Sequence, residues 1–194
     1  MLLAVAAAYG LYAIPRRWPR WASAPVDVVA WLLVLAALVY PIYAIPTKTG
    51  DFRGPPTLDG TAWMAGPFSA DLKAIHWLNE HVTGAPIILE AVGDSYSDYS
   101  HISGLTGLPT VLGWPGHEWQ WRGEYPSQRE ADVKTIYETA STATARALLD
   151  QYDVTYVYVG TLERRDYAPA ALQKFAAFMT VAYDAAGVTI YKRK

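Results

Sequence analysis

Cysteine is absent from this chain of 194 residues, which excludes a disulfide framework, a thiolate metal site and a cysteine nucleophile. Basic residues are not in excess either, because 16 Lys and Arg stand against 18 Asp and Glu for a net charge of −2. Without a basic stripe, no nucleic-acid partner is expected. The phosphate-binding patterns GxGxxG and GxxxxGK[ST] are also missing, which disfavours nucleotide binding. We predict no cofactor, although a divalent metal in a longer protein stays open.

Charge is missing from one long run, Val28 to Ile45. As a helix this run would measure roughly 27 Å, close to the hydrocarbon thickness of a bilayer. Trp31 lies near one end, and Tyr40 and Tyr43 lie near the other, where membrane proteins favour aromatic side chains. The sequence therefore predicts a transmembrane helix over 28–46, with the lipid bilayer as its partner.

A second apolar run, 1–14, is short for a complete crossing and is interpreted as part of another membrane helix. The segment 15–27 between the two runs is predicted to be a loop, with arginine and no acid between Pro15 and Pro25. The positive-inside rule places such a loop in the cytoplasm and the chain after Pro46 outside it. We expect the chain to be a piece of a larger polytopic cell-membrane protein, whose remaining membrane helices are further partners.

The remainder divides into a linker at 47–67, rich in glycine and proline, and a domain at 68–194. Helical periodicity and β-branched runs alternate along this domain, which predicts a three-layer α/β fold with a mostly parallel sheet and a C-terminal β-hairpin. Helices are expected at 69–82, 127–140, 143–152 and 169–178, and strands at 87–92, 110–112, 154–159, 180–183 and 188–192.

Ligands of such sheets bind beyond the carboxyl ends of the strands. Polar and aromatic residues gather in the loops expected there, most densely at 106–123, where glycine and proline favour a shaped loop. Glu163 and Arg164 follow a third strand into the same region. The candidate binding residues are Asp94, Ser95, Tyr96, Trp114, His117, Glu118, Trp119, Trp121 and Arg122.

Aromatic faces beside a carboxylate and a guanidinium suit a sugar or a sugar phosphate, because the ring can stack while arginine binds an oxygen. An alternative is a structural loop in which Glu118 pairs with Arg122 and the domain is a non-catalytic interaction module anchored in the membrane. Burial of the 114–122 side chains would favour this module, and an open cleft would favour binding.

Two self-contained chemistries fit poorly. Gly93-Asp94-Ser95 after a strand is similar to the nucleophile block of SGNH-type serine hydrolases, but the only D-x-x-H is Asp98 to His101, beside the serine. The zinc motif H-E-x-x-H fails because tryptophan occupies position 121. No metal ligand and no catalytic residue is assigned.

The runs SYSDYSHISGLTGLPTVLGWPGHEWQWRG, DVKTIYET and YVYVGTLER resemble the C-terminal part of the uncharacterised "YYY" integral membrane family of archaea and Chloroflexi-like bacteria. That family looks like the GT-C class of lipid-sugar-dependent glycosyltransferases. The resemblance implies an extracytoplasmic α/β domain that helps to bind a polyprenyl-phosphate sugar or an acceptor. It also implies that the catalytic acid lies in an earlier loop, outside this chain.

Overall fold

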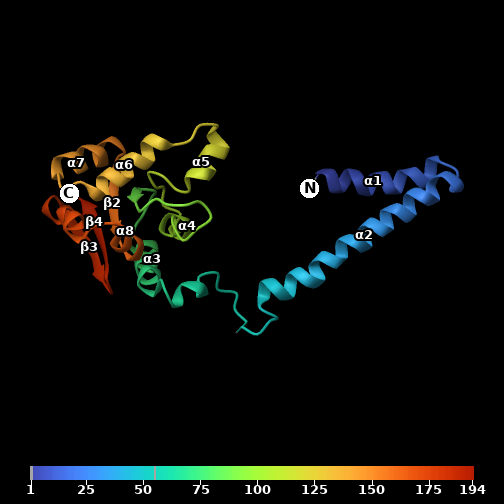
Figure 1. Ribbon diagram of the computed structural model, residues 1–194, viewed down its shortest axis with the longest axis horizontal. Coiled ribbons are helices and arrows are strands. Elements are labelled where there is room, and N and C mark those ends of the chain that lie inside the picture. The colour runs from blue at the N-terminus through green and yellow to red at the C-terminus, as the bar shows by residue number, and fades with distance from the viewer. Residues whose placement is uncertain (1, 55) are drawn as a thin grey trace. The chain divides into compact units, whose positions relative to one another are not determined.

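The computed structural model describes residues 2–54 and 56–194, so that Met1 and Pro55 lie outside the described residues. The chain forms two compact units, Met1–Leu58 and Asp59–Lys194. Figure 1 shows the helices of the first unit and the mixed helices and strands of the second.

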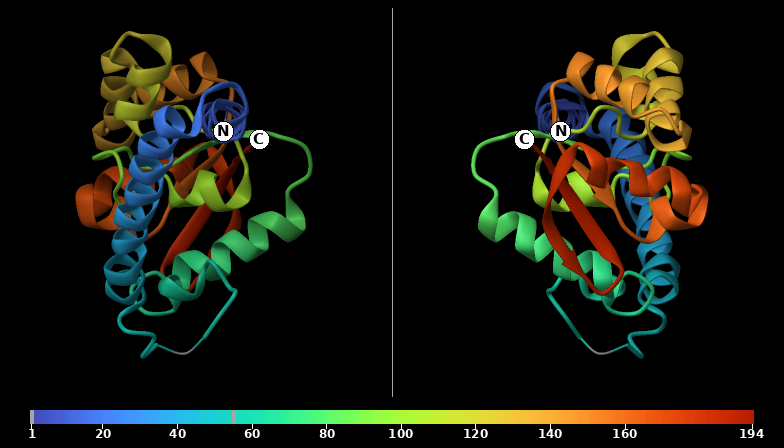
Figure 2. Two further views of the ribbon diagram at one scale, coloured as in Figure 1. Left: turned by 90° about the vertical axis from the view of Figure 1, so that its right-hand side faces the viewer. Right: turned by 90° about the vertical axis from the view of Figure 1, so that its left-hand side faces the viewer.

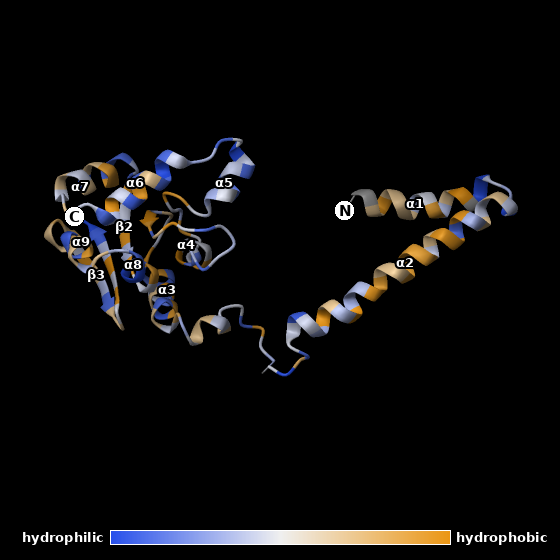
Figure 3. Ribbon diagram, viewed as in Figure 1, coloured by the Kyte–Doolittle hydropathy of each residue, from blue (hydrophilic) through white to orange (hydrophobic). Residues whose placement is uncertain are grey.

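The first unit consists of two helices, α1 (Leu2–Arg17) and α2 (Arg20–Thr49). α2 has 30 residues and is apolar over most of its length (Figure 3), which makes it long and apolar enough to cross a membrane. The loop expected over 15–27 is shorter, since both helices continue into it and only 18–19 separate them. Gly50, in the left-handed conformation at φ 59°, ends α2.

A four-stranded sheet forms the centre of the second unit, in the order β1-β2-β4-β3. β1 and β2 are parallel, whereas β4 is antiparallel to both β2 and β3. The α/β class and the C-terminal hairpin are confirmed. The sheet is mixed and not mostly parallel, because the hairpin joins it through β4 and so brings two antiparallel pairs. The strands are β1 (Ile87–Leu89), β2 (Val154–Val159), β3 (Met179–Ala185) and β4 (Val188–Arg193).

The hairpin turn consists of Ala186 and Gly187, at φ 53° and 88°. A two-residue turn with positive φ at both positions matches the right-handed twist of the flanking strands. The turn lies within the segment expected to connect them, 184–187.

The sheet carries helices on both faces, as the three-layer prediction requires. Side chains of β2 alternate between the faces: Tyr156 and Tyr158 pack in one hydrophobic cluster, and Val157 and Val159 pack in the other. Figure 2 shows α3 crossing the β3–β4 hairpin on the first face. That face is covered by η1 (Ala62–Ala65), α3 (Ser69–His81) and α4 (His101–Thr106), and the other by α6 (Ser127–Glu138), α7 (Thr142–Gln151), α9 (Pro169–Gln173) and η2 (Lys174–Ala177).

Two expected strands are shorter in the structure. The strand at 110–112 is reduced to one parallel bridge with Ile88. β1 ends at Leu89, and beyond it the backbone N–H of Ala91 donates to the side chain of Glu163 and not to a neighbouring strand. The connection after β2, expected without regular structure, forms the short helix α8 (Thr161–Asp166).

Candidate functional site

The helix α5 (Pro115–Arg122) forms where the sequence predicts a shaped loop. Pro115 lies at the first turn, where a fixed φ and a missing N–H fit a helix. Gly123, at φ 79°, ends the helix in the left-handed conformation. The prediction of a loop is therefore wrong for these residues, because the proline and the glycine mark the two ends of a helix.

Three aromatic rings meet where the loop after β1 reaches the start of α5. The ring centroids of Tyr96 and His117 lie 4.8 Å apart, those of Trp114 and His117 5.1 Å, and those of Tyr96 and Trp114 5.3 Å. The His117 ring is T-shaped to both partners, at interplanar angles of 81° and 71°, a favourable aromatic geometry. Tyr96 is 67% exposed, so this ring cluster presents an aromatic face to solvent.

Hydrogen bonds fix the loop to the helix below the rings. Ser95 Oγ accepts from the backbone N–H of Gly116 at 2.8 Å, and Trp114 Nε1 donates to the carbonyl of Tyr99 at 2.7 Å. A Cβ on Gly116 would lie 2.7 Å from Ser95 Oγ, so a larger residue there would displace the Ser95 side chain from this hydrogen bond. Ser95 is thus an anchor of the ring cluster.

The geometry around Ser95 lacks the features of a serine hydrolase. His101 Nδ1 lies 2.6 Å from the backbone carbonyl of Asp98, so that the imidazole is oriented by the main chain and not by the carboxylate. Ser95 itself bonds to Gly116. The histidine and aspartate of the D-x-x-H spacing are therefore committed to a local turn.

The remaining predicted binding residues make no direct contact with the three rings. Glu118 and Arg122 form an ion pair one helical turn apart, through Arg122 Nε. Trp119 and Trp121 are 55% and 86% exposed, and Asp94 is exposed in the loop before the ring cluster. The structure joins Ser95, Tyr96, Trp114 and His117 by direct contacts and places the others around them.

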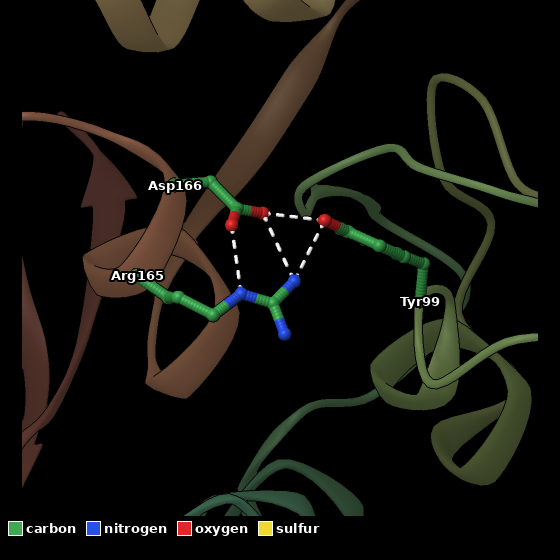
Figure 4. Close-up of polar contacts among 3 residues, drawn as sticks. All are labelled: Tyr99, Arg165 and Asp166. Atoms are coloured by element: carbon green, nitrogen blue, oxygen red, sulfur yellow. Dashed lines mark hydrogen bonds and ion pairs between the residues drawn. The ribbon is translucent and has the colours of Figure 1, made fainter.

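Tyr99 connects this region to α8 through a cluster with Arg165 and Asp166 that the sequence does not indicate (Figure 4). Its hydroxyl donates to Asp166 Oδ2 at 2.6 Å and accepts from Arg165 Nη2 at 2.8 Å, while Arg165 Nε donates to Asp166 Oδ1 at 2.8 Å. Burial opposes ionisation of Asp166, but the hydrogen bonds from Arg165 and Tyr99 outweigh it and lower the pKa of that carboxyl. The carbonyl of Tyr99 meanwhile holds Trp114. One residue thus ties α8 to the ring cluster.

Replacing Tyr99 by phenylalanine removes only the hydroxyl. We expect the free energy of unfolding to fall by about 1 kcal/mol, because two hydrogen bonds are lost at a partly exposed ion pair. Urea unfolding of the full chain in detergent measures this change. Tyr125→Phe is the matched control, since its hydroxyl also donates to a carboxylate, Glu130 at 2.9 Å, but on the surface. An equal effect of both substitutions would contradict a role for Tyr99 in holding α8.

Two carboxylates are buried at the ends of the parallel strands. Glu163 accepts from the backbone N–H of Ala91 at 2.7 Å and of Gly160 at 2.9 Å, and burial raises its pKa to about 7. Glu90 accepts from the backbone N–H groups of Ile102 and Ser103, the second and third residues of α4, both at 3.1 Å, and burial raises its pKa as well. The acid in the otherwise apolar strand IILEAV is the signal in the sequence that could have identified Glu90.

Neither residue expected after β2 reaches the ring cluster by a direct contact. Glu163 is 2% exposed, and its carboxylate is occupied by the backbone N–H groups of Ala91 and Gly160. Arg164 instead donates to the hairpin, to the carbonyl of Gly187 at 2.6 Å and to Thr189 Oγ1 at 2.9 Å. Within residues 2–54 and 56–194, no three side chains of His, Cys, Asp or Glu converge as a metal site would require.

No protein-family model matches the chain, and no curated protein does. Among the solved structures, the C-terminal globular domain of an oligosaccharyltransferase from Archaeoglobus fulgidus is similar to it at 12% sequence identity, with a TM-score of 0.43. The similar part covers 66% of this chain and 97% of that domain.

Proposed function

We propose that the second unit is the extracytoplasmic domain of a glycosyltransferase-like membrane protein and that it helps to bind a lipid-linked sugar or its acceptor at the ring cluster. The catalytic acid would then lie outside this chain. The observation that carries the proposal is the convergence of Tyr96, Trp114 and His117 at the start of α5, with Tyr96 open to solvent. The resemblance of the sequence to the "YYY" family suggests that the ligand is a lipid-linked sugar or its acceptor.

The ring cluster suits a sugar because the apolar face of a pyranose packs on an aromatic ring. His117 is held by its ring contacts and Trp114 by its bond to Tyr99. A ligand would therefore meet side chains that are already in place, and little conformational entropy is lost on binding.

Arg122 suits the phosphate of such a ligand. Its Nε is bound to Glu118, which leaves the two terminal nitrogens of the guanidinium to form paired hydrogen bonds with phosphate oxygens. Glu118 would orient the guanidinium and accept from sugar hydroxyls. Trp119 and Trp121 on the same helix offer further stacking surface.

Removal of one ring tests the site. We expect Trp114→Ala, in the full chain in detergent, to weaken binding of a short-chain isoprenyl-phosphate mannose or glucose about tenfold, the equivalent of roughly 1.4 kcal/mol. Arg122→Gln is expected to weaken the same probe but to leave binding of the free hexose unchanged, since only the phosphate contact is lost. Isothermal titration calorimetry measures both changes.

Trp77→Phe is the matched control, because Trp77 is half-buried and stacks on His81 at 4.9 Å, in a different aromatic group of the same unit. Its affinity for the probe should equal that of the unaltered chain. Equal affinities for all three variants would refute the site. Unchanged glycan products from a full-length protein with Glu118 or Arg122 substituted would also count heavily against it.

The second candidate is a non-catalytic interaction module. The mutual pairing of Glu118 with Arg122 and the internal bond of Trp114 favour it, because satisfied groups need no ligand. The high exposure of Trp119 and Trp121 argues against this module, because burial of the 114–122 side chains is what it requires.

A further inference from the structure

Asp27 is the only charged residue between Arg20 and Lys48, and it lies in α2, the helix that is long and apolar enough to cross a membrane. It is also the only acid among the first 50 residues. At about 1.5 Å per residue, it lies roughly 10 Å along the helix from Arg20, just before the uncharged run 28–45. Acids within membrane helices are rare, and they face a bundle interior or pair with a charge of opposite sign. A partner for Asp27 is therefore expected.

Asp27 lines a groove between α1 and α2, the two helices of the first unit. These helices meet at residues 18–19 and diverge from there (Figure 1). The groove has a volume of about 360 Å³ and is lined by Leu11, Tyr12, Asp27, Ala30, Trp31 and Val34. The four residues from α2 occupy positions i, i+3, i+4 and i+7, which lie on one face of a helix. One surface thus presents the carboxylate beside apolar and aromatic side chains.

The basic residues near the bend between the two helices do not neutralise Asp27. Arg16 donates to the backbone carbonyl of Tyr12 at 3.1 Å, and its guanidinium carbon lies 3.7 Å from the centre of the Tyr12 ring. Among the residues that the structure describes, no ion pair or side-chain hydrogen bond involves Asp27, Arg17 or Arg20. The charge in the groove is therefore left for a group from elsewhere.

The lining of the groove indicates what fits it. Tyr12, Trp31 and Val34 are 57%, 67% and 45% exposed, so the groove is open to a large occupant. A lysine or arginine at the level of Asp27 would neutralise the carboxylate where the dielectric constant is low, and the rings of Tyr12 and Trp31 also attract a cation. Ala30 and Val34 lie deeper, and a small residue such as alanine lets another helix approach closely. A lipid headgroup would leave this apolar part uncovered.

We propose that the groove between α1 and α2 binds a transmembrane helix from outside residues 1–194, and that a lysine or arginine of that helix pairs with Asp27. The ring cluster and its ligand take no part in this contact. The two proposals can therefore fail separately.

Designed helices in phosphatidylcholine liposomes provide the probe. Two membrane-spanning peptides of leucine and alanine differ at one position, at the depth of Asp27, where one carries lysine and the other leucine. The absence of cysteine permits a single donor fluorophore on a Trp18→Cys variant of the full chain, since Trp18 is 54% exposed beside the bend. Energy transfer to an acceptor on the peptide measures binding. We expect the lysine peptide to bind about tenfold more tightly than the leucine peptide.

Substitutions at Asp27 separate pairing of charges from general helix packing. Asp27→Asn should remove the preference for the lysine peptide. Asp27→Lys should reverse the preference, so that a peptide with glutamate at the same position binds more tightly than the lysine peptide. Asp51→Asn is the matched control, because Asp51 follows α2 at its other end and pairs with Arg53 at 3.6 Å. This variant should keep the tenfold preference.

Three results would overturn the proposal. Equal affinities of the unaltered chain for the lysine and leucine peptides would show that Asp27 recognises no basic helix. Loss of the lysine preference when phosphatidylethanolamine replaces phosphatidylcholine would identify a lipid amine as the occupant. Energy transfer between donor-labelled and acceptor-labelled copies of the chain, abolished by Asp27→Asn, would identify a second copy instead.

Discussion

Replacing Gly160 by alanine is expected to lower the free energy of unfolding by about 3 kcal/mol or more, since it overpacks the core and breaks a buried hydrogen bond. The added Cβ would lie 2.4 Å from Asp71 Oδ1 and 2.4 Å from Tyr158 Cε1. Asp71 is fully buried and Tyr158 is 1% exposed, so neither has room to move. Asp71 accepts from the hydroxyls of Tyr158 and Thr161, which ties α3 to the start of α8. The substitution would separate these elements.

Gly104→Ala is the matched control for Gly160→Ala. Gly104 lies inside α4, where a Cβ meets nothing within 4 Å, and alanine should stabilise the helix by roughly 0.5–1 kcal/mol. Urea unfolding of the full chain in detergent compares the two variants. A loss below about 0.5 kcal/mol for Gly160→Ala, within the range of ordinary surface substitutions, would show that the junction of β2 and α8 has room to spare.

Stability is expected to fall as the pH rises through neutrality because of Glu163. Burial raises the pKa of this carboxyl from its ordinary 4.5 to about 7. The folded state therefore binds a proton that the unfolded state has already released at intermediate pH. The contribution is fully present below pH 4.5 and is lost as the pH rises through 7, and it amounts to roughly 3 kcal/mol. The burial of Glu90 acts in the same direction.

A Glu163→Gln variant isolates this contribution, because glutamine does not titrate. The variant is less stable at low pH, since one amide N–H₂ must face the backbone N–H of Ala91 or Gly160. The informative quantity is the difference in unfolding free energy between the two proteins, measured from pH 4 to pH 8. This difference should shrink as the pH rises. A constant difference would mean that Glu163 titrates equally in the folded and unfolded states.

The sequence predicted correctly those helices and strands whose residues show a strong periodic or β-branched pattern. The β-branched and aromatic run VTYVYV is β2 with the expected bounds, 154–159. The helical spacing of Leu72, Ile75 and Leu78 identified α3, which ends one residue before the expected end. In both cases the side-chain periodicity matches the burial that the fold requires.

The elements that were missed depend on contacts distant in sequence. α5 is short and stands between glycine and proline residues, so composition favoured a loop over a helix. The short strand β1 ends at Leu89, and the backbone N–H of Ala91 just beyond it donates to Glu163, 72 residues away. No local sequence pattern predicts a hydrogen bond between such distant residues. Of the candidate site, the ring residues were predicted, whereas Tyr99, Arg165 and Asp166 were not, since their partnership joins segments 66 and 67 residues apart.

The buried carboxylates also affect the mobility of the loops at the carboxyl ends of the parallel strands. Loops at such an edge commonly fluctuate and become ordered only when a ligand arrives. Here Glu90 and Glu163 hold the amides of Ile102, Ser103, Ala91 and Gly160 from within. The amides of these connecting segments should exchange with solvent as slowly as those of the strands. The loops at this edge of the sheet are therefore rigid before any ligand binds, and a ligand that binds there must match the shape that they already have.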